Sequence, residues 1–106
     1  MSFQNLKDIK EREIFPGYKA KFVHSENMTF AHWTIEEGSS FPEHSHEHEQ
    51  VLSMLEGKLE LKVGRDTKIL MPGDIAIIPS NVPHSGKAIK KTNAIDVFYP
   101  VRQDYV

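Results

Sequence analysis

Short segments with strand character, separated by turn residues at close intervals, constrain the fold of this chain more than any other feature. The segment 58–63 alternates cleanly, with Leu59, Leu61 and Val63 on one face and charged residues on the other. Glycine, proline and acidic residues separate it from similar segments at 28–35, 50–55, 67–71, 75–78 and 94–99. Helical periodicity is weak outside the charged stretch 6–14, which is expected to be peripheral. The pattern predicts an all-β protein, an antiparallel sandwich or barrel.

Two of the stretches between these segments are expected to be turns. The pair Glu56-Gly57 is predicted to make a tight turn, because glycine allows the left-handed backbone that many tight turns need. The basic residues Lys87, Lys90 and Lys91 are predicted to form a solvated turn before the last strand.

Length and composition exclude several classes of protein. A chain of 106 residues is expected to form one domain, and 39% hydrophobic with 26% charged residues is typical of globular proteins. The formal charge of -2 gives no reason to expect nucleic acid or an anionic membrane as a partner. The longest apolar run, Ile75–Ile78, is too short to cross a bilayer. The lack of cysteine excludes disulfides, thiolate metal sites and a cysteine nucleophile, and a cytoplasmic location is expected.

Three histidines stand close together in the middle of the chain. His44, His46 and His48 share one face if this stretch is a strand, and Gln50 continues that face. Two imidazoles from one strand can bind a metal ion but do not complete its site, and His84 is a plausible third ligand because Pro83 stiffens the backbone before it. The alternative is a solvated loop, since Glu43, Glu47 and Glu49 interleave with the histidines.

Two spaced motifs resemble the signatures of the cupin superfamily. The first reads Gly38, five residues, His44-x-His46, three residues, Gln50, six residues, Gly57. The second follows after 15 residues and reads Gly73, five residues, Pro79-x-Asn81, two residues, His84. The resemblance implies an antiparallel jelly-roll β-barrel (a double-stranded β-helix) with its core at about 17–102 and a metal ion inside. It also implies the metal ligands, which are His44, His46, Gln50 and His84.

The chain departs from the cupin pattern at three positions. Gln50 stands where the family usually has glutamate, Asn81 replaces a glycine, and Ala88 replaces the closing asparagine. Asparagine tolerates the left-handed backbone almost as glycine does. The amide oxygen of Gln50 can coordinate a metal but adds no charge, which favours a Lewis-acid role toward an anionic, oxygen-rich substrate over redox chemistry. His48 has no counterpart among the family's ligands and is expected to be partly exposed or to support a ligand.

A closer resemblance links the chain to small cupins of pectin and alginate degradation, which linearise 4,5-unsaturated uronate monosaccharides. The shared features are the segment 44–50, with glutamine for glutamate, and a C-terminal Asp-x-Phe-x-Pro-x-Arg pattern. That pattern implies that Asp96, Phe98 and Arg102 line the active site. Asp96 would act as general acid/base, Arg102 would hold the substrate carboxylate and Phe98 would shape the pocket. The expected protein is an isomerase that uses one divalent metal (nickel, zinc, manganese or iron), and a homodimer.

Several alternatives stay open from the sequence. Asp96 and Arg102 could instead form an ion pair that only fastens the C-terminal segment. The protein could be a metal-dependent dioxygenase, or a cupin that binds a small molecule without converting it. His24 and His32 are expected to be ordinary strand or loop residues. Some aromatic side chains could line a sugar-sized pocket or belong to the core, namely Phe30, Trp33, Phe41 and Tyr99.

Overall fold

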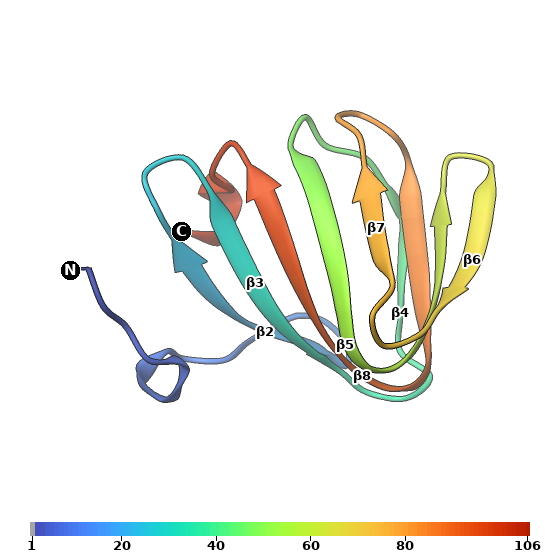
Figure 1. Ribbon diagram of the computed structural model, residues 1–106, viewed down its shortest axis with the longest axis horizontal. Coiled ribbons are helices and arrows are strands. Elements are labelled where there is room, and N and C mark those ends of the chain that lie inside the picture. The colour runs from blue at the N-terminus through green and yellow to red at the C-terminus, as the bar shows by residue number, and fades with distance from the viewer. Residues whose placement is uncertain (1) are drawn as a thin grey trace.

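The computed structural model describes residues 2–106 and consists almost entirely of antiparallel strands (Figure 1). The first elements are a 3-10 helix η1 (Leu6–Asp8), β1 (Arg12–Phe15), β2 (Tyr18–His24), β3 (Thr29–Ile35) and β4 (Ser40–His44). They are followed by β5 (Glu49–Val63), β6 (Asp66–Leu70), β7 (Ile75–Ile78), β8 (His84–Tyr99) and a second 3-10 helix η2 (Gln103–Tyr105). This confirms the predicted all-β class and is consistent with a cupin jelly roll.

Two long strands, β5 and β8, organise the sheet. They pair from Glu49↔Tyr99 to Val63↔His84, and the hydrogen-bonded order is β1-β2-β3-β8-β5-β6. The first half of β5 pairs with β7 and its second half pairs with β6. The first half of β8 pairs with β4 and its second half pairs with β3. Each long strand therefore passes from one wall of the curved sheet to the other (Figure 1).

The predicted tight turn at Glu56-Gly57 is wrong, because these residues lie inside β5. The register of β5 against β8 shifts between Met54 and Leu59, so the strand bends there instead of reversing. Gly57 has φ +94°, and a Cβ atom at this position would lie 2.7 Å from the Cα of Thr92. A bulge and a turn both need glycine at a left-handed position, which explains the error. The predicted lysine turn is wrong for a similar reason: Lys87, Lys90 and Lys91 are exposed residues of β8.

The N-terminal part of the chain also differs from the expectation. The weak helical pattern over 6–14 becomes only the three-residue helix η1, followed by β1. The sequence analysis does not predict strands at β2 and β4. The sequence of β2 nevertheless alternates, with Tyr18, Ala20 and Phe22 separated by lysines, and these three residues are the buried ones.

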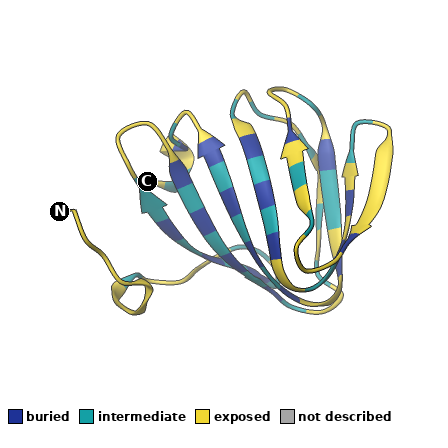
Figure 2. Cartoon of the chain, viewed as in Figure 1, coloured by how far each residue is buried: buried dark blue, intermediate teal, exposed yellow. Residues whose placement is uncertain are grey.

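One face of each central strand is buried and forms the core between the walls (Figure 2). Most of this interior is apolar, with Trp33, Leu52, Leu59 and Ile78 among its buried side chains. Six polar or charged residues are buried with them: Thr29, Gln50, His84, Thr92, Asp96 and Arg102. Thr29, Thr92 and Arg102 have hydrogen-bond partners in the chain. His84 and Asp96 each keep one buried atom without a partner in residues 2–106, which is costly unless something binds there. None of the helices in residues 2–106 is long and apolar enough to span a membrane.

Candidate functional site

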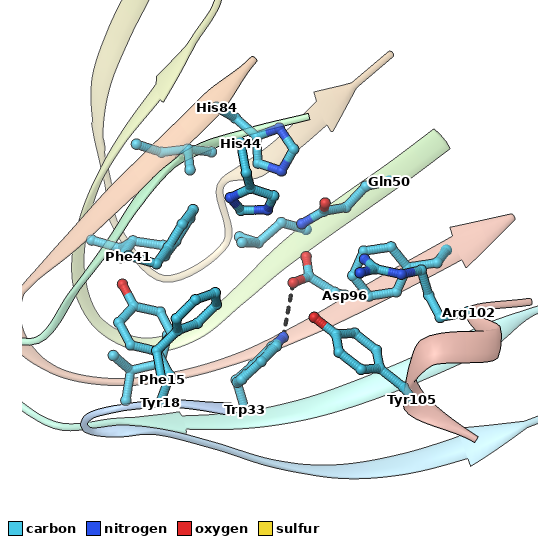
Figure 3. Close-up of a pocket in the computed structure, with 15 residues that line it drawn as sticks. Phe15, Tyr18, Trp33, Phe41, His44, Gln50, His84, Asp96, Arg102 and Tyr105 are labelled. Atoms are coloured by element: carbon cyan, nitrogen blue, oxygen red, sulfur yellow. Dashed lines mark hydrogen bonds between the residues drawn. The ribbon is translucent and has the colours of Figure 1, made fainter. Parts of the chain in front are cut away.

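Three histidines, His44, His46 and His84, form a cluster, and two of them, His44 and His84, are drawn in Figure 3. The ligand nitrogens of His44, His46 and His84 all lie within 4.8 Å of one another. His44 on β4 is the direct cross-strand partner of His84 on β8, which brings these two rings to 4.4 Å between centroids. His46 follows in the connection to β5, so the stretch from His44 to Gln50 is not one strand and the condition for a shared strand face is not met. The cluster forms through β-pairing and a loop rather than through a shared strand face.

Each of these imidazoles has one nitrogen at a backbone carbonyl. The Nδ1 atoms of His44, His46 and His84 lie 3.0, 3.0 and 2.9 Å from carbonyl oxygens of Pro42, His48 and Val82. A carbonyl only accepts hydrogen bonds, so each neutral ring donates its Nδ1–H and keeps its lone pair on Nε2. The buried Nε2 of His84 has no hydrogen-bond partner in the described chain. The tautomer with its proton on Nδ1 and its lone pair on Nε2 is the one that binds a metal through Nε2.

The surroundings favour the uncharged form of two of the three imidazoles. Burial, and next the charges of Arg102 and His84, lower the pKa of His46 to about 4. Burial also lowers the pKa of His84. Both rings are therefore neutral at physiological pH, as metal ligands must be.

Gln50 faces the same point in the interior. Its Oε1 lies 3.2 Å from Nε2 of His46. Because Nε2 of His46 carries the lone pair of the neutral ring, this contact brings two acceptors, Oε1 and Nε2, together. A cation between them would satisfy both. The donor set, three imidazoles and an amide oxygen, suits a divalent transition metal.

Asp96 lies beside the cluster with one oxygen fixed and the other free. Trp33 donates Nε1–H to Oδ2 at 2.8 Å, whereas the buried Oδ1 has no partner among residues 2–106. Burial raises the pKa of Asp96 to about 6, although the nearby Gln50 amide, the hydrogen bond from Trp33 and the charge of Arg102 oppose the rise. A carboxyl group with such a pKa can exchange a proton near neutral pH.

Arg102 does not form the alternative ion pair with Asp96. Its Nε and Nη2 instead donate to Oδ1 and Oδ2 of Asp104, at 3.0 and 2.7 Å. The guanidinium lies 4.2 Å from the ring centre of Tyr105 and 4.8 Å from that of Phe98. Asp104 and Tyr105 were missed from the sequence, because a short segment after the last strand has no periodicity to interpret.

A pocket of about 500 Å³, counted out to its open mouth, connects these groups. His44, Gln50, His84, Asp96, Phe98 and Arg102 all line it, so most of the predicted site residues meet in one cavity (Figure 3). Its aromatic wall consists of Phe15, Tyr18, Trp33, Phe41, Phe98 and Tyr105.

Several of the other residues considered from the sequence lie outside the pocket. Of the four candidate aromatics, Trp33 and Phe41 line the pocket, whereas Phe30 and Tyr99 do not. The ring centre of His48 is 5.5 Å from that of His46, but His48 is not part of the three-histidine cluster. His24 bonds Thr29 through its Nδ1. Asn81 has φ +65°, as expected for a residue at a glycine position, and its N–H donates to the carbonyl of His46.

Comparisons with known proteins agree with this architecture. The RmlC-like cupin from Shewanella frigidimarina NCIMB 400 is 25% identical, with a TM-score of 0.94, 100% of this chain covered and 96% of that chain. KdgF from Halomonas sp. is also 25% identical, with a TM-score of 0.92 and coverage of 100% and 99%. Quercetin 2,3-dioxygenase from Bacillus subtilis (strain 168) is 46% identical over 50 residues, 45% of this chain. That match spans only 14% of the dioxygenase.

The family model that matches the chain is described as a cupin domain, and it covers residues 31–98. This region runs from β3 to the end of β8 and contains the three-histidine cluster, Gln50 and Asp96. The likeness to two small cupins extends over the full length of all three chains or nearly so. The chain belongs to the cupin family.

Proposed function

We propose that this cupin is an isomerase that promotes ring opening of 4,5-unsaturated uronate monosaccharides. The observation that carries the proposal is the arrangement around Asp96. Its carboxylate is held by Trp33 through one oxygen, while the other has no partner in residues 2–106, and the pocket that Asp96 lines is also lined by His44, His84 and Arg102. A proton-transfer group, an anion-binding group and a candidate metal site thus share one cavity.

His44, His46, His84 and Gln50 would hold a divalent transition metal, because their donor atoms are directed at a common point. Bound there, the metal would supply Lewis-acid polarisation of a substrate oxygen. The Nδ1 contacts to backbone carbonyls hold the imidazole rings in orientation, so the site is organised by the protein itself.

Asp96 is the proton-transfer residue of the proposed mechanism. Its Oδ1 takes the proton from the anomeric hydroxyl as the C1–O5 bond breaks, which leaves an aldehyde at C1 and an enolate at C5. It then returns the proton to C4, so that the enolate becomes a ketone at C5. Trp33 keeps Oδ2 engaged and thereby directs Oδ1 into the pocket. The aromatic wall limits competing water around this carboxylate.

Arg102 is the proposed partner of the substrate carboxylate. A guanidinium has five N–H donors, and Asp104 occupies two of them, which leaves donors for a second carboxylate. Phe98 and Tyr105 lie against the guanidinium, restrict its movement and dry its surroundings. A carboxylate bound there would place the sugar ring beside Asp96.

Two comparisons support this choice of substrate. The C-terminal Asp-x-Phe-x-Pro-x-Arg pattern and the glutamine in the first motif are those of the uronate-linearising cupins. KdgF, a uronate-linearising cupin, resembles the chain over the whole length of both proteins.

A metal-dependent dioxygenase is the second candidate. It is favoured by the local likeness to quercetin 2,3-dioxygenase, at 46% identity over 50 residues. Three neutral histidines can also bind ferrous iron. Oxygen consumption by iron-loaded protein in the presence of a flavonoid would favour this candidate over the isomerase.

The experiment that tests the isomerase is proton NMR of an unsaturated galacturonate monomer with metal-loaded protein. We expect the vinyl proton signal to disappear faster with the intact protein than in buffer. The His84→Ala variant is expected to match the spontaneous rate. Equal rates in all three samples would reject the proposed substrate, and binding without conversion would favour a cupin that only binds its ligand.

We also propose that the protein is a cytoplasmic homodimer. The outer face of the sheet carries a row of aligned apolar residues across four strands: Phe30, Val97, Val51 and Ile77. Ile77 and its neighbour Ile75 are about two-thirds exposed, at 65% and 64%. An isologous contact between two such faces would remove these side chains from water.

A further inference from the structure

The buried polar atoms without partners include two groups that the proposed mechanism does not use, and one of these, Tyr18, lines the pocket. In residues 2–106 four such side-chain atoms occur: the Tyr18 hydroxyl, Nδ1 of His48, Nε2 of His84 and Oδ1 of Asp96. His84 and Asp96 already have roles in the pocket. Tyr18 is only 3% exposed and lines the same pocket, so its hydroxyl is a third free polar group there.

The ring of Tyr18 is held on three sides by aromatic neighbours. Edge-to-face contacts connect it to Phe41 at 5.2 Å, Trp33 at 5.9 Å and Phe15 at 6.3 Å between ring centres. Such packing fixes the position of the hydroxyl oxygen, so the ring does not move to bring it to a partner. Phenylalanine would fill the same space without leaving a polar atom unpaired, so the hydroxyl costs stability.

Tyr18 and Arg102 lie at opposite ends of the pocket, with Asp96 between them (Figure 3). Burial, and next the charge of Asp96, raise the pKa of Tyr18, so its hydroxyl stays protonated and able to donate. The aromatic side chains around it suit the apolar C–H face of a sugar ring. The two ends thus differ in chemistry: one binds a carboxylate, and the other offers a single hydroxyl in an aromatic wall.

We propose that Tyr18 is a specificity-determining residue, whose hydroxyl hydrogen-bonds a ring hydroxyl of the substrate at the end remote from its carboxylate. This assignment rests on the proposed function and defines the ligand further. The pocket selects a small hydroxylated acid and rejects acids of similar size that lack the hydroxyl. A site built to bond a hydroxyl discriminates in this way because its own polar group is otherwise left unpaired.

The test compares Tyr18→Phe with Tyr99→Phe, the same chemical change on an exposed tyrosine outside the pocket. Loss of one neutral hydrogen bond should raise KM for the unsaturated uronate about three- to tenfold with little change in kcat. With the 2-deoxy or the 3-deoxy analogue, whichever lacks the bonded hydroxyl, Tyr18→Phe and wild type should have the same KM. Equal KM values for the full substrate would overturn the assignment.

The stability of Tyr18→Phe distinguishes a ligand-binding role of the hydroxyl from a structural role. If the hydroxyl serves the ligand, Tyr18→Phe should unfold at the same or a higher denaturant concentration than wild type while its KM rises. A variant that is both less stable and weaker in binding would mean that the hydroxyl supports the fold, and would overturn the assignment.

A separate measurement distinguishes failure of this inference from failure of the proposed function. If wild type does not convert the unsaturated uronate, the function proposal fails, and thermal protection by saturated galacturonate still tests Tyr18. Protection of wild type that is lost in Tyr18→Phe and kept in Tyr99→Phe would support the assignment. No protection of wild type, or equal protection of all three proteins, would overturn it.

Discussion

At the scale of single residues, Asp96 differs from the other acidic side chains because it is buried, at 5% exposed, without a cationic partner in direct contact. Arg102, the cation that could neutralise it, is paired with Asp104 instead. A carboxylate in such a position costs stability unless it has a task, and its free Oδ1 is directed into the pocket. The function proposal therefore depends on this residue more than on any other.

Replacing Asp96 with asparagine should abolish turnover and leave metal content unchanged. The amide preserves the shape of the side chain and can still accept from Trp33, but it cannot transfer a proton. We expect the rate to fall by at least about 100-fold. NMR kinetics and elemental analysis of the purified protein provide the two measurements.

Asp66→Asn is the matched control, because Asp66 is an exposed residue of β6 and the variant should keep both activity and metal. Loss of bound metal from Asp96→Asn would show that Asp96 is a ligand or a structural residue. Turnover at the wild-type rate would contradict its role as acid/base.

The sequence predicted which residues meet in the pocket better than how they meet. His44, His46 and His84 come together as the motif spacing indicated, but through a strand pair and a loop. Asp104 could not be found in this way, because its contact with Arg102 depends on how the chain turns after β8. Tyr18 could have been predicted as an inward-facing residue, since it begins a segment in which apolar residues alternate with lysines.

At the scale of elements, the bend in the two long strands allows one sheet to enclose the pocket. β5 carries Gln50 before its bulge and, after it, Leu59 and Leu61, two apolar residues that line the pocket. The same bend crosses β8, which carries His84 at one end and Asp96 near the other. Alternation within 50–55 and 58–63 predicted strands on both sides, but alternation alone does not reveal whether the chain between them bends or reverses.

Gly57→Ala should destabilise the protein strongly because two effects add. The backbone has φ +94°, and a Cβ atom would collide with the β8 backbone at Thr92. We expect a loss of about 3 kcal/mol or more in the free energy of unfolding, measured by denaturant titration.

Gly73→Ala separates these two effects. Gly73 has nearly the same conformation, φ +93°, but nothing lies within 4 Å of its Cβ position, so only backbone strain applies. Its loss should be about 1–2 kcal/mol. If both variants lost the same stability, close packing of the two strands at the bulge would not be the reason for glycine at position 57.

At the scale of the whole molecule, the inner and outer faces of the sheet have different uses. The inner face forms the core and the pocket, whereas the outer face carries the apolar row that ends at Ile77. Exposed apolar rows of this kind are typical of contact surfaces. Within residues 2–106 the short strand β7 pairs with β5 alone, so its other edge is unpaired. Association of two chains can protect such an edge.

Ile77→Lys should convert the proposed dimer to a monomer without unfolding it. The introduced charges would face each other or apolar groups across an isologous contact, and burying them is costly. Sedimentation velocity of wild type and variant measures the outcome. Ile69→Lys on β6, which is also partly exposed, is the control and should stay dimeric. A monomeric wild type would contradict the proposal.

We propose that this pocket linearises an unsaturated uronate with a metal held by His44, His46, His84 and Gln50. Adding a divalent metal back to chelated protein, while NMR follows the rate of vinyl-proton loss, tests this proposal. We expect the spontaneous rate without metal, then an increase that saturates at one metal per chain, with no increase for His84→Ala. A rate that does not depend on the metal, or an equal response of His84→Ala, would contradict it.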